Sequence, residues 1–171
     1  MMNKNGKENK GFTFVEMLLC VLLVGLLTLV VAAGSKTALD VYRQSVRYAE
    51  SRVLSATLLK AMESELCYAD DLKENTIEGE KRITFASASY GNDVFFLVND
   101  KGRICVQKQD SSTLLLGEKM YPNGLGVESL EITVSPADKV QGSYGKAVKI
   151  KLKMKDGNTV ETQFLNVNMK K

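Results

Sequence analysis

Residues 11–34 of the chain read GFTFVEMLLCVLLVGLLTLVVAAG, an apolar run in which Glu16 is the one charged residue. From Met17 to Gly34 the run carries no charge at all. At a rise of ~1.5 Å per residue, a helix over residues 12–34 is long enough to cross a hydrocarbon core of about 30 Å. The stretch therefore predicts a transmembrane helix near the N-terminus, followed by a separate folded part.

The leader that precedes this run, residues 1–11, is short, polar and basic, with a net charge of +2. Basic residues beside a membrane helix stay in the cytoplasm. We therefore expect a single-pass protein of the cytoplasmic (inner) membrane, with the N-terminus inside and the C-terminal domain outside. The competing interpretation is a secretory signal cut after the small residues 31–33, VAA. Glu16 disfavours it, because an acidic residue beside the apolar core is atypical of such signals.

The Glu16 carboxylate is the first candidate functional group of the chain. A charged side chain in a membrane helix costs at least ~2.5 kcal/mol near the centre of the bilayer, so ionisable groups there are functional candidates. A carboxylate in that position needs a cation beside it. The apolar run offers none, and the nearest basic residue before it is Lys10.

Residues 10–16, KGFTFVE, resemble the processing site of type IV pilins and of the pseudopilins of type II secretion and DNA-uptake systems. The resemblance implies that a prepilin peptidase cuts between Gly11 and Phe12 and that the new Phe12 N-terminus is methylated. It further implies that Glu16 of one subunit pairs with the Phe12 amine of a neighbour during assembly. The missing cation would then be the N-terminus of another copy.

The same resemblance implies a structural filament subunit rather than an enzyme, without a cofactor. Its partners would be the peptidase, other pilin or pseudopilin subunits, an inner-membrane platform protein, an assembly ATPase, and membrane lipid before assembly into an extracellular filament. Residues 126–132, GVESLEI, and the lysine-rich hairpin after them are similar to J-type minor pseudopilins. Filaments of this kind serve secretion, adhesion, motility or DNA uptake. An anchored or secreted β-rich domain unrelated to filaments is the other class of function that we consider.

Residues 35–72 predict an amphipathic continuation of the helix, because they contain neither proline nor glycine and their apolar residues recur every three or four positions. We expect the face from Val53 onward to pack on the chain's own globular domain. Nearer the membrane, packing between subunits is an equal alternative. The expected face comprises Leu39, Tyr42, Val46, Ala49, Val53, Ala56, Leu59, Met62, Leu66 and Ala69.

Residues 73–171 predict a globular antiparallel β domain, because apolar residues alternate with polar ones and turn residues recur at short intervals. The expected strands are residues 82–86, 93–98, 103–108, 113–116, 127–135, 146–155 and 159–167, with a loop over 136–145. The predicted fold is thus α+β and pilin-like, with an antiparallel sheet packed on the C-terminal half of one long helix.

The residue types exclude several chemistries. The chain has no histidine, which removes the commonest general base and metal ligand. Its three cysteines, Cys20, Cys67 and Cys105, show no CxxC spacing, so a thiolate metal site is unsupported. Cys67 and Cys105 are expected as small buried thiols, with a disulfide between them as the alternative. The acidic pairs at 70–71 and at 78 and 80 are expected to be solvated charges rather than a metal or acid/base site.

Four lysines alternate with apolar residues near the C-terminus, which places them on one face of a strand. This lysine stripe comprises Lys149, Lys151, Lys153 and Lys155. Such a stripe can attract phosphate, so a competence pseudopilin that contacts DNA is the alternative function. The competing interpretation is that lysines protect an exposed strand and that Glu131 or Glu161 neutralises part of the stripe. The net charge of the whole chain is only +3, which gives DNA binding little support.

Overall fold

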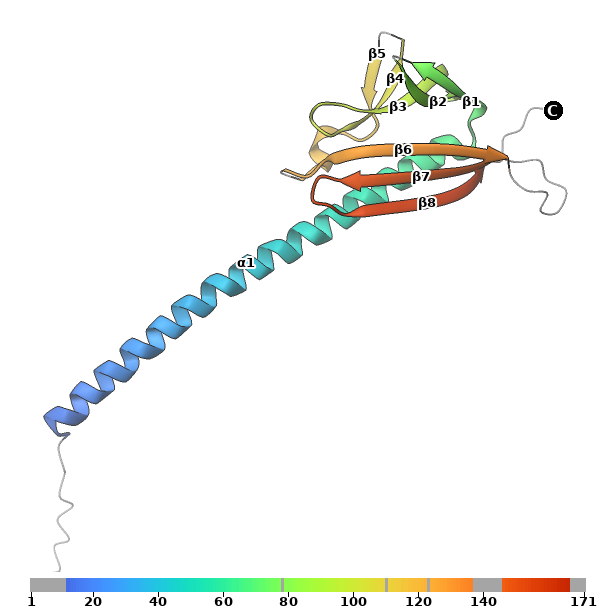
Figure 1. Cartoon of the computed structure of the whole chain (residues 1–171). Helices are drawn as coiled ribbons and strands as arrows, with labels where there is room; N and C mark the ends of the chain where they lie inside the picture. The colour runs from blue at the N-terminus through green and yellow to red at the C-terminus, as the bar shows by residue number, and fades with distance from the viewer. Residues whose placement is uncertain (1–11, 78, 110, 123, 137–145, 167–171) are drawn as a thin grey trace, which may run out of the picture. The chain divides into compact units, whose positions relative to one another are not determined.

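A computed structural model of the chain describes residues 12–77, 79–109, 111–122, 124–136 and 146–166 (Figure 1). One long helix, α1 (Phe14–Cys67), precedes all of the strands. The chain divides into two compact units, residues 1–46 and 47–171, and α1 runs through both. The arrangement is α+β, with a helix packed on antiparallel sheets, as the sequence predicts.

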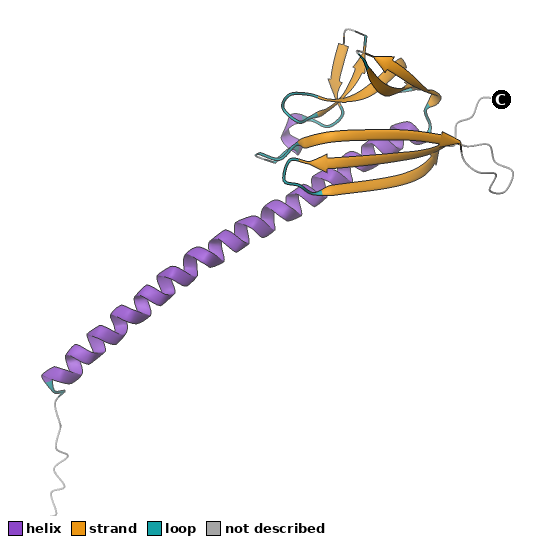
Figure 2. Cartoon of the chain, in the orientation of Figure 1, coloured by secondary structure: helices purple, strands orange, loops and turns teal. Residues whose placement is uncertain are grey.

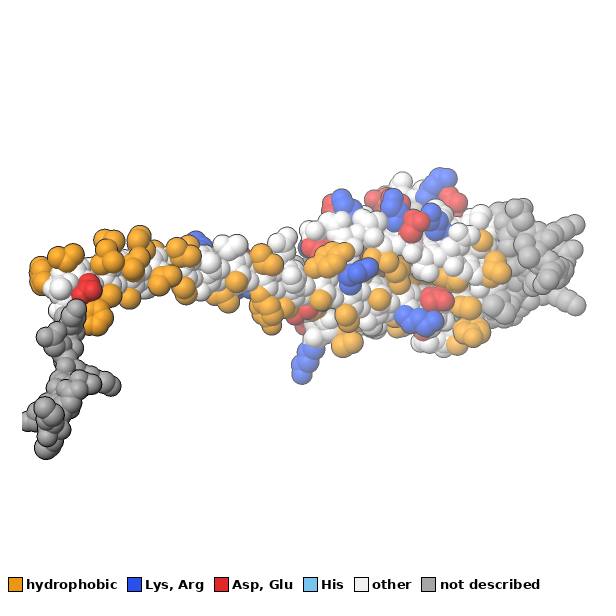
Figure 3. Space-filling view, turned by 90° about the horizontal axis from the view of Figure 1, so that it is seen from below, with side chains coloured by type: hydrophobic (Ala, Val, Ile, Leu, Met, Phe, Trp, Pro, Cys, Tyr) orange, Lys and Arg blue, Asp and Glu red, His pale blue; other side chains and the backbone are white. Residues whose placement is uncertain are grey.

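The first unit, described from Phe12 onward, is a helix whose side chains are all exposed. Its residues 14–33 are apolar on every side of the helix except at Glu16 and Thr28. In Figure 3, apolar side chains cover the side of this part of α1 that the view shows. Within the described residues, α1 is the one helix long and apolar enough to cross a membrane. A signal sequence meets the same criterion, so this finding agrees with a single-pass membrane protein without fixing its orientation.

Residues 47–67 of α1 belong to the second unit and bury one face in its core. The buried positions are Ser51, Leu54, Ser55, Leu58, Leu59, Met62 and Leu66. They follow a helical spacing of three and four, and the two serines are small enough to let the helix backbone approach the strands. The expected face was wrong at two positions from Val53 onward, because Val53 is 68% exposed and Ala56 is exposed too, whereas Leu54 is buried at 3%.

Two antiparallel sheets complete the second unit, where the sequence suggested one (Figures 1 and 2). In the first sheet the strands follow chain order: β1 (Asp70–Ile77), β2 (Glu80–Ser87), β3 (Gly91–Val98), β4 (Ile104–Lys108) and β5 (Ser111–Leu114). The second sheet places β7 (Lys146–Met154) between β6 (Val127–Pro136) and β8 (Thr159–Asn166). A short 3-10 helix, Glu118–Met120, lies between the two sheets in sequence.

The central strand β7 confirms the predicted alternation most clearly. Val148, Ile150, Leu152 and Met154 are fully buried, whereas the lysines between them are exposed. They join a core that also includes Leu58, Met62 and Leu66 of α1 and Phe85 of β2. Both sheets and the end of α1 therefore share one hydrophobic core.

The end of α1 differs from the prediction. The helix stops at Cys67 instead of continuing to residue 72, and residues 70–77 form strand β1, which the sequence did not suggest. Asp71 has a backbone φ of 55°, in the left-handed region, so the chain turns sharply just after the helix. The side-chain amide of Asn166 on β8 donates to the carbonyl oxygens of Leu66 and Ala69, at 2.7 and 2.9 Å. A residue far along the chain thus caps the helix and fixes its end.

Candidate functional site

The first candidate site is the start of α1. The predicted cleavage residue Gly11 and the leader lie outside the described residues, while Phe12 is described and 75% exposed. The carbonyl oxygen of Thr13 accepts the first intrahelical hydrogen bond, from the Met17 N–H at 3.1 Å. Thr13 is therefore the N-cap of the helix, and Glu16 is its third helical residue.

Thr13 and Glu16 form a reciprocal capping box. The backbone N–H and the hydroxyl of Thr13 both donate to Oε2 of Glu16, each at 2.9 Å, and the Glu16 N–H donates to the Thr13 hydroxyl at 3.3 Å. This arrangement satisfies donors that a helix N-terminus otherwise leaves open. The role of Thr13 was not predicted from the sequence, although the spacing Thr-x-x-Glu before an apolar run is the known signature of such a box.

Glu16 has no cation within ion-pair distance among the described residues. Its neighbours along the helix are the exposed apolar side chains of Phe14, Val15 and Met17. The carboxylate is therefore held by hydrogen bonds from its own N-cap and by no opposite charge. Any ion pair at Glu16 would need a cation from the leader, from a new N-terminus or from another molecule.

The lysine stripe is the second candidate site, and the structure brings acidic partners to it. The ammonium groups of Lys149, Lys151 and Lys153 lie 3.1, 3.7 and 2.9 Å from carboxylate oxygens on the neighbouring strands. The respective partners are Glu161 on β8, Glu131 and Glu128 on β6. Of the four lysines, Lys155 is the one without an ion pair among the described residues. The prediction that Glu131 or Glu161 neutralises part of the stripe is confirmed.

The position of the lysine stripe contradicts the expectation that its lysines protect an exposed strand. Its first three lysines lie on β7, the middle strand of its sheet, while Lys155 follows in the turn. A central strand has neighbours on both sides, so its lysines do not protect an exposed edge. They form cross-strand pairs instead, and the face that they occupy carries as many acidic partners as paired lysines.

The remaining polar candidates do not converge on a chemical site. Asp71 pairs with Lys73 at 2.6 Å and Glu80 with Arg82 at 2.8 Å, while Glu78 lies outside the described residues. In the part of the chain that the structure describes, no group of three or more histidine, cysteine, aspartate or glutamate residues could hold a metal ion. All three cysteines are free, with Cys20 exposed, Cys67 partly buried and Cys105 buried.

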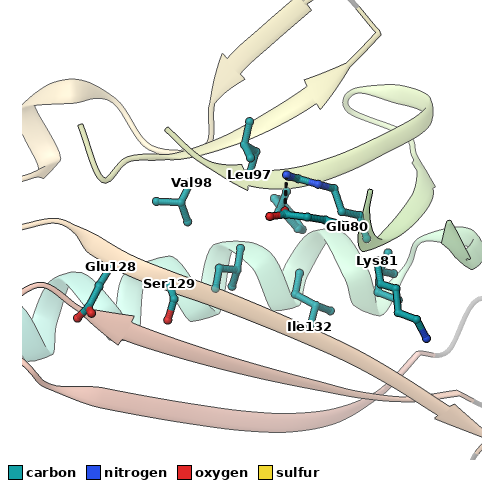
Figure 4. Close-up of a pocket in the computed structure, with 11 residues that line it drawn as sticks. Glu80, Lys81, Leu97, Val98, Glu128, Ser129 and Ile132 are labelled. Carbon is teal, nitrogen blue, oxygen red and sulfur yellow. Dashed lines mark hydrogen bonds and ion pairs between the residues drawn. The ribbon is translucent and has the colours of Figure 1, made fainter. Parts of the chain in front are cut away.

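A cavity of about 400 Å³ lies between the two sheets of the second unit (Figure 4). Leu97 and Val98 of β3 lie on one side of it, and Ser129 and Ile132 of β6 lie on the other. Glu80 and Arg82 of β2, which form an ion pair at 2.8 Å, also line it. Its lining is more polar than apolar and includes two carboxylates, Glu80 and Glu128, but no cysteine. Each carboxylate already forms an ion pair, Glu80 with Arg82 and Glu128 with Lys153, so the two do not form an acid/base pair with each other.

Comparison of the chain with protein-family models, with curated proteins and with solved structures found no match.

Proposed function

We propose that the chain is a pilin-like structural subunit, a minor pseudopilin of a type II secretion or type IV pilus-like filament. The observation that carries the proposal is the position of Glu16. It lies in the first turn of α1, whose residues 14–33 are exposed and, apart from Glu16 and Thr28, apolar on all sides, and no described cation reaches it. The Gly11–Phe12 junction lies only a few residues ahead of it.

The proposed assembly follows from the energetics of that carboxylate. Before assembly, residues 12–34 sit in membrane lipid, where an unpaired carboxylate is costly. Cleavage after Gly11 creates an ammonium group, free or methylated, on Phe12. When this group of one subunit meets Glu16 of the next, both charges are paired and the apolar helices pack together. The prepilin peptidase makes the cut, and a platform protein and an assembly ATPase drive subunits out of the membrane.

The second unit is proposed to face outward from the filament and to select neighbouring subunits. Its finer assignment as a J-type subunit rests only on the sequence of residues 126–132 and of the lysine-rich hairpin after them. DNA uptake is not favoured, because three of the four stripe lysines already pair with glutamates. A DNA-binding face needs uncompensated positive charge to gain affinity by counterion release.

The decisive experiment measures the N-terminal mass of the protein taken from its own cell membranes and from the sheared surface fraction. We expect a chain that begins at Phe12, with or without a methyl group. A chain that begins near Gly34, or one that retains Met1, contradicts the proposal. The companion variant Glu16→Ala should stay in the membrane fraction, whereas the control Glu63→Ala, which removes a partly exposed carboxylate paired with Lys60, should assemble normally.

A further inference from the structure

The capping box uses one oxygen of the Glu16 carboxylate and leaves the other available. Both donors of Thr13, its N–H and its hydroxyl, bond to Oε2. No hydrogen bond to Oε1 is found among the described residues. An ionised carboxylate has about four acceptor positions, so a third donor can be accommodated without displacing Thr13.

We propose that Thr13 is a positioning residue, which holds Glu16 by Oε2 so that Oε1 can receive the ammonium of a neighbouring subunit. This inference rests on the proposed function, because the ammonium is the Phe12 N-terminus created by cleavage. It assigns a role to a residue outside the pair that forms the contact. Thr13 acts before the partner arrives, by fixing the carboxylate at the N-terminus of the helix.

The physical basis is preorganisation. A free glutamate side chain samples many rotamers, and ordering it on association costs conformational entropy. Here the hydroxyl of Thr13 works in both directions, since it donates to Oε2 and accepts from the Glu16 N–H at 3.3 Å. The side chain is therefore ordered in the unassembled chain, and the incoming ammonium meets a carboxylate already in place.

The chain provides matched variants for a test. Thr13→Val keeps the branched shape and the backbone N–H but removes the hydroxyl, whereas Thr13→Ser keeps the hydroxyl. Thr28→Val is the control, because the Thr28 hydroxyl donates to the Val24 carbonyl at 2.7 Å on the same helix, far from Glu16. A general loss of helix stability would affect both valine variants, while a positioning role affects only the one at Thr13.

The first measurement needs no filament. In the full-length, uncleaved chain in detergent micelles, backbone amide exchange at Thr13 is followed by NMR. We expect exchange to be about fivefold slower in the wild type than in Glu16→Ala, because the Thr13 N–H donates to Oε2. Equal exchange rates show that the box does not form in solution and overturn the inference, whatever the protein's function.

The second measurement follows assembly in cells that make wild-type and variant chains together. The ratio of variant to wild type in the sheared fraction is divided by the same ratio in the membrane. We expect Thr13→Val to enter about fivefold less well, which corresponds to ~1 kcal/mol, the usual cost of losing a hydroxyl N-cap. Thr13→Ser and Thr28→Val should enter as the wild type does, with the N-terminus at Phe12 in all four chains.

Equal incorporation of Thr13→Val and wild type refutes the positioning role, as does a serine variant that fails like the valine one. A Thr13→Val chain that keeps Met1 would assign Thr13 to processing instead, and this also overturns the inference. If the wild type itself keeps Met1, the proposed function is wrong and the positioning role falls with it. The exchange measurement then still shows whether the box exists, so the two failures remain distinguishable.

Discussion

Replacement of Asn166 should release the end of α1 from the second sheet. Its side-chain amide is the donor to two backbone carbonyls, those of Leu66 and Ala69, and the residue is only 4% exposed. Asn166→Leu keeps most of the volume and removes both donors. Leu66 O retains a long bond of 3.4 Å from the Ala69 N–H, whereas Ala69 O has no other described donor.

Each buried acceptor left without a donor costs about 1–3 kcal/mol, so we expect Asn166→Leu to lower the free energy of unfolding by about 3 kcal/mol. In a domain of this size that loss corresponds to a fall in Tm of about 10 °C. The assay is thermal unfolding of the full chain in detergent micelles, followed by the near-UV circular dichroism of its tyrosines.

Asn166→Asp gives the same test a pH signature. A carboxylate buried against two carbonyl oxygens has its pKa raised above the ordinary value of about 3.9. Below that value the protonated acid donates to one carbonyl and stability is retained, and it is lost as the pH rises through the raised folded-state pKa. Gln163→Glu is the control, because it makes the same chemical change on the exposed face of β8, where Lys149 is its cross-strand neighbour. If the Tm of Asn166→Leu lies within about 1 °C of the Tm of Gln163→Glu, the helix end is not held by Asn166.

Three further predictions concern the second unit. Tyr121→Phe removes the hydroxyl that accepts from the buried Ile104 N–H at 3.1 Å and should cost about 1–2 kcal/mol in denaturant unfolding, while the exposed Tyr42→Phe should change nothing. Burial raises the pKa of the Tyr121 hydroxyl, so wild-type stability should fall as the pH rises above about 10, and Tyr121→Phe should show a shallower fall. Leu54→Ala should lower stability by about 2–4 kcal/mol and Val53→Ala by less than about 0.5 kcal/mol; equal losses would contradict the helix orientation. Wild-type protein should not shift duplex DNA in gels at about 50 mM salt, whereas the triple variant E128Q, E131Q, E161Q should gain salt-sensitive binding; a wild-type shift would show that the paired lysines remain open to phosphate.

The sequence predicts best those parts of the fold in which the apolar residues alone determine which side chains are buried. Along β7 every second residue is apolar and buried, so the alternation itself carries the strand and its orientation. The apolar run that begins α1 is as easy to interpret, because a helix of this composition is stable only in a membrane or against another apolar surface. Glu16 was identified as a candidate for the same reason, since it is the one charged residue in that apolar run.

Strand β1 could not be predicted in this way. Its sequence, DDLKENTI, has a single buried side chain, Leu72, and no alternation. It forms a strand because it pairs with β2 through residues 70–77, and it begins where it does because Asn166 ends the helix from a position 100 residues away. Local propensity contains neither piece of information.

The rotated helix face has a different cause. Counting apolar residues favoured Val53, and the polar residues Ser51 and Ser55 had no place on the expected face. In the structure both serines are buried, at 0% and 1% exposure, and the Ser55 hydroxyl donates to the Arg52 carbonyl at 3.0 Å. The Ser55 hydroxyl is satisfied within the helix, whereas the Ser51 hydroxyl is buried without a hydrogen-bond partner among the described residues. Both positions therefore face the core because serine is small, although only one of them satisfies its polar group.

Polar groups in the second unit are matched mainly within that unit. The stripe lysines meet glutamates on both neighbouring strands, and Glu65 of α1 accepts hydrogen bonds from Ser87 and Ser89 at 2.6 and 3.1 Å. The first unit is the opposite, since its apolar surface is exposed throughout and its Glu16 has hydrogen bonds but no described cation. Folding of the single chain thus pairs most polar groups of the second unit, apart from a few buried atoms such as the Ser51 hydroxyl. The apolar surface of the first unit stays exposed and needs a membrane or other helices to cover it. In the filament that we propose, association strength would be concentrated in the first unit, and the nearly neutral sheet face would contribute selectivity through its alternating charges more than through net attraction.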